Sequence, residues 1–244
     1  MFLWRCLIVN IARFDASSSS LIMKLLWLGI SAIWLGSGLC LSLSFAPAFA
    51  QDYQPPSDRG RQQQADAQGS RGDCNNQALH LLIPEDHTPN TIAARPTFFF
   101  YSEFKRVSFV LSAPGRSEPL YEREMMINTP RVVRVEIPET APPLEVGQEY
   151  VWTVVARCPS AGQIYARASL RRVELTSGLD KALSVAKSNE ARTRILAQQG
   201  LWHDALAVAF APGNESDYFW RLLAEIGVHQ FNDLADAPKG ATGD

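Results

Sequence analysis

The spacing of apolar residues changes once along this chain, near Ser177, and this change constrains the fold more than any other feature. From Cys74 to about Leu175, apolar and polar residues tend to alternate, as they do in strands with one buried face. After Ser177 the apolar residues recur every three or four positions, as they do in helices packed on one side. Strands in one half and helices in the other predict an α+β fold with segregated halves.

The first half contains seven β-rich runs separated by residues that favour turns. They cover residues 78–84, 97–102, 106–113, 120–127, 131–138, 149–158 and 165–175. Prolines fall between these runs or at their ends, where a missing N–H costs no ladder hydrogen bond. Short strands at this spacing are typical of an immunoglobulin-like antiparallel β-sandwich, which we expect over residues 74–176.

The segment LEVGQEYVWTVVARC, residues 144–158, carries a more specific signal. Tyr150 follows Leu144 across Gly147 and stands just inside a predicted strand. This arrangement resembles the tyrosine corner of fibronectin type III and other immunoglobulin-like domains, in which the hydroxyl group bonds back to the preceding corner. One face of this strand carries the side chains that we assign to the core: Tyr150, Trp152, Val154, Ala156 and Cys158.

The first fifty residues are expected to be a leader and not part of the fold. Residues 25–45 are uncharged and follow Lys24, and the stretch APAFA ends at Ala50. A basic start, an apolar middle and a small-x-small end predict a signal peptide cleaved after Ala50. The apolar run is also long enough for an uncleaved membrane anchor, which is the alternative. Met23 is an alternative start of translation.

Two further segments are expected to lack structure. Residues 51–73 are rich in Gln, Asp, Arg, Gly and Pro and carry one aromatic residue. Because such a segment buries too little apolar surface to offset the loss of chain entropy, we expect a disordered spacer. We also expect a flexible tail over residues 237–244.

The cysteines predict one disulfide. Two of the four, Cys6 and Cys40, leave with the predicted leader. Cys74 at the first strand and Cys158 at the end of a predicted buried face remain. An even pair in an exported protein favours a bridge, and in an antiparallel sandwich these strand ends can meet. A pair of buried thiols is the alternative.

Residues 177–236 are expected to form a small α-helical bundle. Ser177 and Ser188 are candidate N-caps, and Gly200 is a candidate C′ residue at a helix end. The sequence GLWHDAL, residues 200–206, matches the turn between the helices of tetratricopeptide repeats and predicts a helical hairpin of that kind. The residues assigned to its packing are Gly200, Trp202, Ala205 and Leu206.

His203 and Asp204 stand side by side in this turn and invite a catalytic interpretation. In a helix they point about 100° and 200° away from Trp202, because each residue turns the helix by about 100°. Adjacent helical residues do not face each other, so we expect no hydrogen bond between them. We predict that both side chains are exposed to solvent.

We predict no catalytic residue, no metal site and no cofactor. The sequence contains no GxSxG, HExxH, P-loop or GxGxxG motif, and its four histidines lack the spacing of metal ligands. His80 forms one mixed cluster with Glu85, Asp86 and His87, which we interpret as a solvated turn with an incomplete ligand set.

The charge excludes one class of partner. The net charge is −2, and the loss of three basic residues and one acidic residue with the leader lowers it to about −4, which is not the basic footprint of a nucleic-acid-binding protein. Arg157, Arg167 and Arg171 occupy outward positions on two late strands and form a candidate anion-binding face. Membrane contact is expected only if the leader stays uncleaved.

These pieces, in this order, resemble a cyanobacterial family of exported proteins that contains the domain of unknown function DUF928. The resemblance covers residues 71–227 and rests on Gly72, Cys74, ALHLLIP (78–84), RPTFFFY (95–101), PPLEVGQEYVWTVVARC (142–158) and GLWHDAL (200–206). It implies export and the fold, and it implies no activity.

Two functional hypotheses follow. The first is an exported, non-enzymatic binding or structural module of the cell envelope or periplasm, whose partner is another envelope protein or an anionic envelope polymer. The second is a hydrolase of envelope polymers. Its active site would be assembled from carboxylates far apart in the sequence, which leave no local motif.

Overall fold

The computed structural model describes residues 51–58, 60, 68–69, 74, 77–158, 162–210 and 217–226. All of them belong to one unit, Phe49–Asp244. The predicted leader and the predicted tail lie outside the described residues. Among the residues that are described, no helix is long and apolar enough to span a bilayer.

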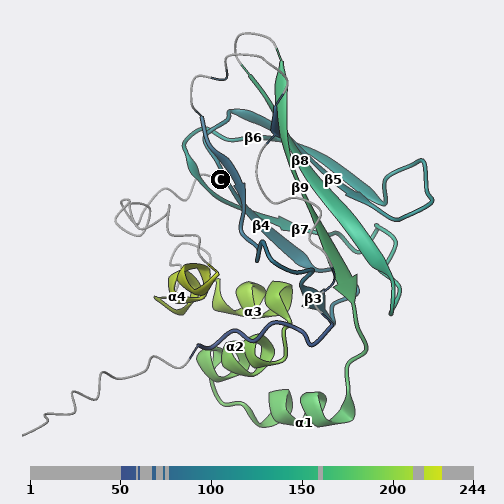
Figure 1. The fold of residues 1–244 in the computed structure, drawn as a ribbon, viewed down its shortest axis with the longest axis vertical. Coiled ribbons are helices and arrows are strands. Elements are labelled where there is room, and N and C mark those ends of the chain that lie inside the picture. Colours follow the sequence, from purple (N-terminus) through teal and green to yellow (C-terminus); the bar gives the residue numbers. More distant parts are fainter. Residues whose placement is uncertain are drawn as a thin grey trace, which may run out of the picture. The chain divides into compact units, whose positions relative to one another are not determined.

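The β-rich half forms two sheets, and each of the seven predicted runs supplies one strand (Figure 1). The larger sheet has the order β1-β9-β8-β5-β6 with β3 paired to β9, and the smaller sheet has the order β2-β4-β7. The strands are β1 (Gln68–Gly69), β2 (Leu79–Leu81), β3 (Asn90–Thr91), β4 (Thr97–Ser102), β5 (Arg106–Ser112), β6 (Tyr121–Met126), β7 (Arg131–Glu136), β8 (Glu149–Arg157) and β9 (Gln163–Arg172). Only the two-residue strands β1 and β3 were not predicted.

The two sheets turn apolar faces toward each other. Phe98 of β4 in the smaller sheet contacts Trp152 of β8 in the larger one, with ring centroids 5.0 Å apart, and neither side chain is exposed. Val133 and Val135 of β7 are buried, as their alternation predicts. The fold is therefore α+β, and this contact between the sheets favours the predicted sandwich.

Four helices follow the strands in the described part of the chain: α1 (Ser177–Val185), α2 (Asn189–Gln198), α3 (Trp202–Ala209) and α4 (Asp217–Glu225). The N-cap of α1 is Thr176 and not the predicted Ser177, because the Thr176 hydroxyl accepts the N–H of Leu179. Ser188 caps α2 as predicted. Gly200 adopts a φ of 70°, which favours glycine, and lets the chain turn from α2 into α3.

The segment 51–58 is not the disordered spacer that we predicted. It runs as an irregular segment across α2 and α3 toward β3 (Figure 1). Tyr53 is only 1% exposed, and the N–H of Gln54 donates to the carbonyl of Ala197 at 3.0 Å. The compositional prediction was wrong because it counted only the apolar area within the segment. Tyr53 instead buries its ring in a site that distant residues build.

Cys74 and Cys158 form a disulfide, with their Cα atoms 5.0 Å apart. Cys158 follows β8 directly, and its backbone N–H donates to the carbonyl of Gly162 at the start of β9. The bridge therefore fixes the chain that leads into the sheets to one end of the β8–β9 pair.

The disulfide should account for a measurable share of stability. The double substitution Cys74→Ser and Cys158→Ser should lower the free energy of unfolding by about 4 kcal/mol, because the bridge joins residues 84 apart in the chain and restricts the unfolded ensemble. Thiol titration of unreduced, denatured protein lacking the leader should detect no free cysteine. A reductant should lower the melting temperature of the wild type but not of the double variant. Two titratable thiols in oxidised protein would contradict the bridge.

Candidate functional site

The three arginines of the predicted anion-binding face do not form a row. Arg157, Arg167 and Arg171 all lie on the outer face of the β8–β9 pair. Arg167 and Arg171 are four residues apart on β9, or about 13 Å along the strand. Arg171 forms an ion pair at 2.7 Å with Asp58 of the N-terminal segment. The charge of Arg171 is thus already compensated by an acidic residue of the same chain.

The residues of the predicted tyrosine corner lie together. The Tyr150 hydroxyl accepts the backbone N–H of Glu145 at 2.6 Å, and Leu144 is buried. Gly147 has a φ of 81°, and its N–H donates to the carbonyl of Arg172 at 2.8 Å. This geometry pins the loop before β8 to the end of β9, from which the chain enters the helices.

The turn around Gly200 is where the helices meet the N-terminal segment. A Cβ atom at Gly200 would lie 3.1 Å from the Gln54 carbonyl oxygen and from Pro56, so glycine permits the close approach. Trp202, Ala205 and Leu206 are buried, as predicted. The inner side of the α2–α3 pair is therefore covered by the chain itself.

Tyr53 is the anchor of the N-terminal segment. Its ring packs edge-on against Trp202, with centroids 4.9 Å apart, and stacks on His87. The Tyr53 hydroxyl lies 2.6 Å from His87 Nε2, and His87 Nδ1 lies 2.6 Å from a carboxylate oxygen of Asp86. An ionised carboxylate only accepts, so Nδ1 is the donor to Asp86, and this tautomer leaves Nε2 to accept the Tyr53 proton.

This hydroxyl–imidazole–carboxylate chain resembles a general-base relay in its geometry. A relay must reach its substrate, however, and Tyr53 and His87 are each only 1% exposed. The arrangement therefore holds the N-terminal segment in place. The prediction of a solvated turn at residues 85–87 is wrong for His87, because the Tyr53 ring covers it.

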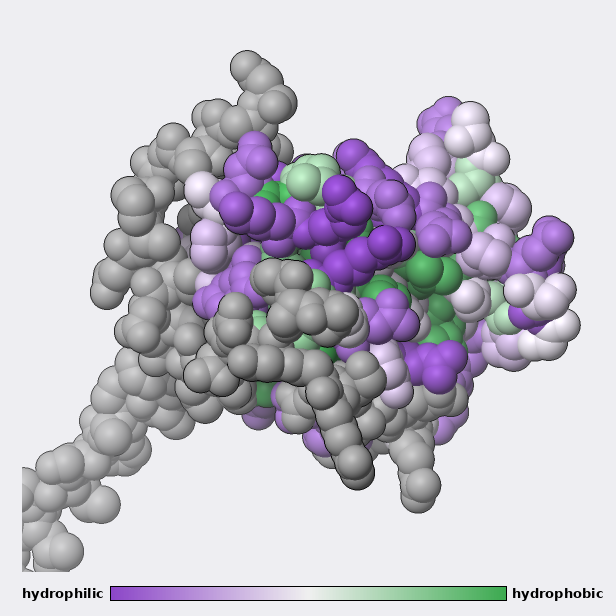
Figure 2. Space-filling view, turned by 90° about the horizontal axis from the view of Figure 1, so that it is seen from above, coloured by the Kyte–Doolittle hydropathy of each residue, from purple (hydrophilic) through white to green (hydrophobic). Residues whose placement is uncertain are grey.

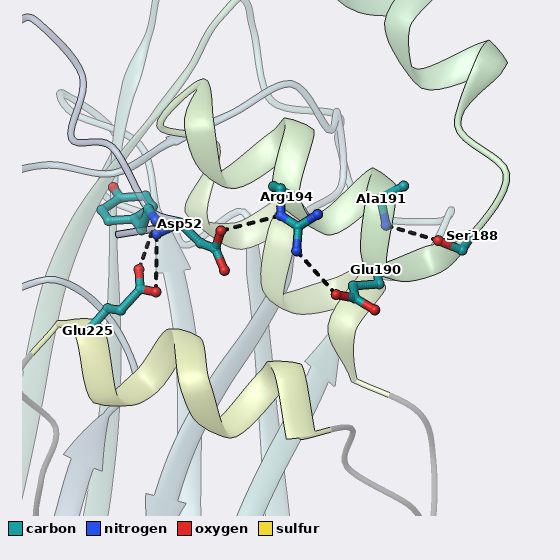
Figure 3. A network of polar contacts seen from close by, with 7 residues as sticks. Asp52, Ser188, Glu190, Ala191, Arg194 and Glu225 are labelled. Atoms are coloured by element: carbon teal, nitrogen blue, oxygen red, sulfur yellow. Dashed lines mark hydrogen bonds and ion pairs between the residues drawn. The ribbon is translucent and has the colours of Figure 1, made fainter. Parts of the chain in front are cut away.

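A second set of contacts fixes the start of the segment (Figure 3). The backbone N–H groups of Asp52 and Tyr53 donate to the two carboxylate oxygens of Glu225, at 3.1 and 2.8 Å. The Asp52 carboxylate accepts from Arg194 Nε at 3.3 Å, and Arg194 also contacts Glu190 at 3.1 Å. The segment thus joins α2 to α4 through backbone and charged groups.

His203 and Asp204 are not exposed side chains, contrary to our prediction. His203 is 2% exposed, its Nδ1 lies 3.4 Å from the Thr97 carbonyl, and its ring contacts Phe98. Asp204, on the same helix, accepts the N–H of Ile92 at 3.1 Å. The prediction failed because α3 is enclosed by β3, β4 and the N-terminal segment on more than one side. The two side chains take separate partners, as the spacing predicts.

Burial shifts the pKa of both groups. It lowers the pKa of His203 to about 4, which keeps the ring neutral near neutral pH. It raises the pKa of Asp204 to about 6, although hydrogen bonds from Thr91 and Ile92 oppose the shift. Sequence reasoning missed this pair and Tyr53. A lone aromatic residue in a polar segment, as in DYQPP, is the signal that could have indicated an anchor.

No cluster of three or more His, Cys, Asp or Glu side chains that would suit a metal ion occurs within the ranges that the structure describes. His87, His203 and Asp204 are of the residue types that serve as catalytic groups in enzymes, but here they hold the N-terminal segment and α3 in place. The site is thus an intramolecular docking site for residues 52–58.

Comparison with known proteins identifies one family. The sequence profile of the domain of unknown function DUF928 matches residues 66–233, which includes both sheets and all four described helices. The searches of curated proteins and of solved structures found no significant match.

The opposite pKa shifts of His203 and Asp204 predict how the free energy of unfolding depends on pH. As the pH falls from 6.5 to 4, the unfolded chain takes up a proton at His203 before the folded one does, which destabilises the fold. Below about pH 6 the folded state binds a proton at Asp204 more readily than the unfolded chain, which stabilises it.

Asp204→Asn removes only the second effect. Urea unfolding of this variant should therefore show a steeper loss of stability than the wild type between pH 6.5 and 4. The control Asp180→Asn changes an exposed carboxylate of α1 and should keep the wild-type profile. An Asp204→Asn profile parallel to the wild type would contradict the assignment.

Proposed function

The chain belongs to the DUF928 family, and we propose that it is an exported protein of the cell envelope or periplasm that binds a partner protein and performs no catalysis. The Cys74–Cys158 disulfide carries this proposal, since such bonds form and persist in oxidising compartments outside the cytosol. An immunoglobulin-like sandwich joined to a tetratricopeptide-like hairpin is the finer fold that the proposal assumes.

The engagement of polar groups in packing supports a binding role. His87, His203 and Asp204 each hold a structural contact around the N-terminal segment or α3. A hydrolase of envelope polymers would need carboxylates brought together from elsewhere in the chain. The experiment below distinguishes this alternative from a binding role.

The outer face of the larger sheet is the surface that we assign to the partner. On this face partly buried Val155 and Thr153 of β8 lie opposite Tyr165 and Arg167 of β9, and Tyr165 is 39% exposed. Tyrosine and arginine are enriched in protein interfaces. Charges of both signs occur here, since Glu124 of β6 lies 3.8 Å from Arg157. A mixed face suits a protein partner better than a polyanion.

The face of the molecule seen from above Figure 1 is mixed as well (Figure 2). In the view from above Figure 1, hydrophilic side chains cover much of the described surface, with hydrophobic areas between them (Figure 2). The α2–α3 pair, where we predicted a tetratricopeptide-like hairpin, is covered on its inner side by residues 53–56. The outer sheet face is therefore the better candidate.

The proposal predicts a partner that depends on this face. Protein purified from the envelope fraction of its host should begin at Gln51 and retain a specific protein after cross-linking. Tyr165→Ala combined with Arg167→Glu should abolish this retention, because it removes the aromatic contact area and inverts the charge. Glu118→Ala, an exposed change in the loop between β5 and β6, should leave it intact.

Two results would contradict the proposal. One is a retained protein that both variants keep, which would place the contact elsewhere. The other is turnover of an envelope glycan or peptide by the purified protein, which would favour the hydrolase. If the intact mass of the host-derived protein includes the leader, the protein is anchored in the membrane and is not released as a free exported protein.

A further inference from the structure

Docking of the N-terminal segment begins at the second residue after the predicted cleavage point. Gln51 is the first residue of the predicted mature chain, and the next two backbone N–H groups, those of Asp52 and Tyr53, already donate to Glu225. Gln54 then bonds to Ala197, and Tyr53 is buried. The new chain end that cleavage creates is therefore held in place by its neighbours.

Glu225 occupies a position that its own helix disfavours. It is the last residue of α4, where the negative end of the helix dipole repels a carboxylate. Its two oxygens gain compensation from outside the helix, through the N–H groups of Asp52 and Tyr53. A positive charge beside these groups would compensate it further.

We propose that Glu225 is the receptor for the α-ammonium group that cleavage after Ala50 creates at Gln51, so that proteolytic maturation completes the docking of the N-terminal segment. This inference rests on the proposed export and processing. In the uncleaved chain the same nitrogen is a neutral amide, which offers one N–H and no charge.

The reach is short enough for this contact. The Asp52 nitrogen is 3.1 Å from Glu225 Oε1, and one residue advances the backbone by at most about 3.6 Å, which places the Gln51 nitrogen within about 7 Å of that oxygen. The other charged or titratable groups on this side are Asp52 itself, Arg194 and Glu190 of α2, and Tyr218 and Arg221 of α4. Arg194 pairs with Asp52 and Glu190, and the Arg221 guanidinium lies over the Tyr218 ring at 4.5 Å, so among the described residues neither cation forms an ion pair with Glu225.

The contact has a chemical consequence. An N-terminal glutamine cyclises when its neutral α-amine attacks the side-chain carboxamide carbon; a new C–N bond forms and the amide nitrogen leaves as ammonia. Only the deprotonated amine is a nucleophile. A carboxylate that holds the amine as ammonium should therefore slow cyclisation and preserve the charge.

The test compares the chain that begins at Gln51 with one that begins three residues earlier, at Ala48, each with and without Glu225→Gln. The α-amino pKa of Gln51, measured by pH-dependent acylation, should exceed the usual value of about 7.7–8.0. It should return toward that value in Glu225→Gln. Loss of ammonia from the intact mass should be slower in the wild type than in Glu225→Gln.

Stability gives a second readout. The chain that begins at Gln51 should have a melting temperature about 1–3 °C above that of the chain that begins at Ala48, near neutral pH, as expected for one exposed ion pair. The sign follows from a raised folded-state pKa: the gain is present below the unfolded α-amino pKa and is lost as the pH rises through the folded one. Glu118→Gln, which removes an exposed charge away from the segment, should leave this difference unchanged.

An ordinary α-amino pKa in the wild-type chain would overturn the inference, as would a melting difference that survives in Glu225→Gln. If Glu225→Gln does not fold, N-terminal acetylation of the wild type removes the charge alone and should abolish the difference; an unchanged difference would also overturn the inference. These measurements use chains with defined first residues, so their outcome is distinguishable from that of the proposed function, which is tested by partner retention and by turnover of envelope substrates.

Discussion

The contact between Trp202 and the loop after β2 joins the helical half of the fold to the sheets. The indole N–H donates to the carbonyl of Leu82 at 2.8 Å, and the Trp202 side chain is fully buried. Once this bond sets α3 against the smaller sheet, His203 lies under β4 and the Tyr53 ring packs nearly perpendicular to the Trp202 ring. Burial of one large aromatic residue with its polar atom satisfied is a strong local stabilisation.

The N-terminal segment adds further contacts between the helices and the sheets. It binds Glu225 and Arg194 at its start, crosses Gly200, and pairs Asp58 with Arg171 of β9. β1 then covers part of the edge of β9, and the disulfide at Cys74 follows. The strands and helices are segregated in the sequence, yet their stability is coupled through a segment that belongs to neither half.

The strands other than β1 and β3 were predictable because each carries a local signal in the sequence. Alternation along β7 and β8 is visible in the sequence, and it predicted which of their side chains are buried. The Gly200 turn and the Ser188 cap were predictable for the same reason, since caps and turns depend on a few adjacent residues.

The N-terminal docking site could not be predicted in this way. Tyr53, His87 and Trp202 are far apart in the chain, and burial of each depends on the presence of the others. A helical periodicity defines one buried stripe, and it does not show that other segments will cover the flanks of α3. The errors at His203, His87 and residues 51–58 therefore share one cause, which is tertiary contact around Trp202.

Native-state hydrogen exchange tests the coupling of the two halves most directly. If Trp202 and the N-terminal segment unite them, the slowest amides of α2 and α3 should exchange with the same free energy and denaturant dependence as those of β8, through one global opening. Exchange of the α2 and α3 amides through a separate opening of lower free energy, with β8 still protected, would show that the helices are an independent unit and would contradict this account.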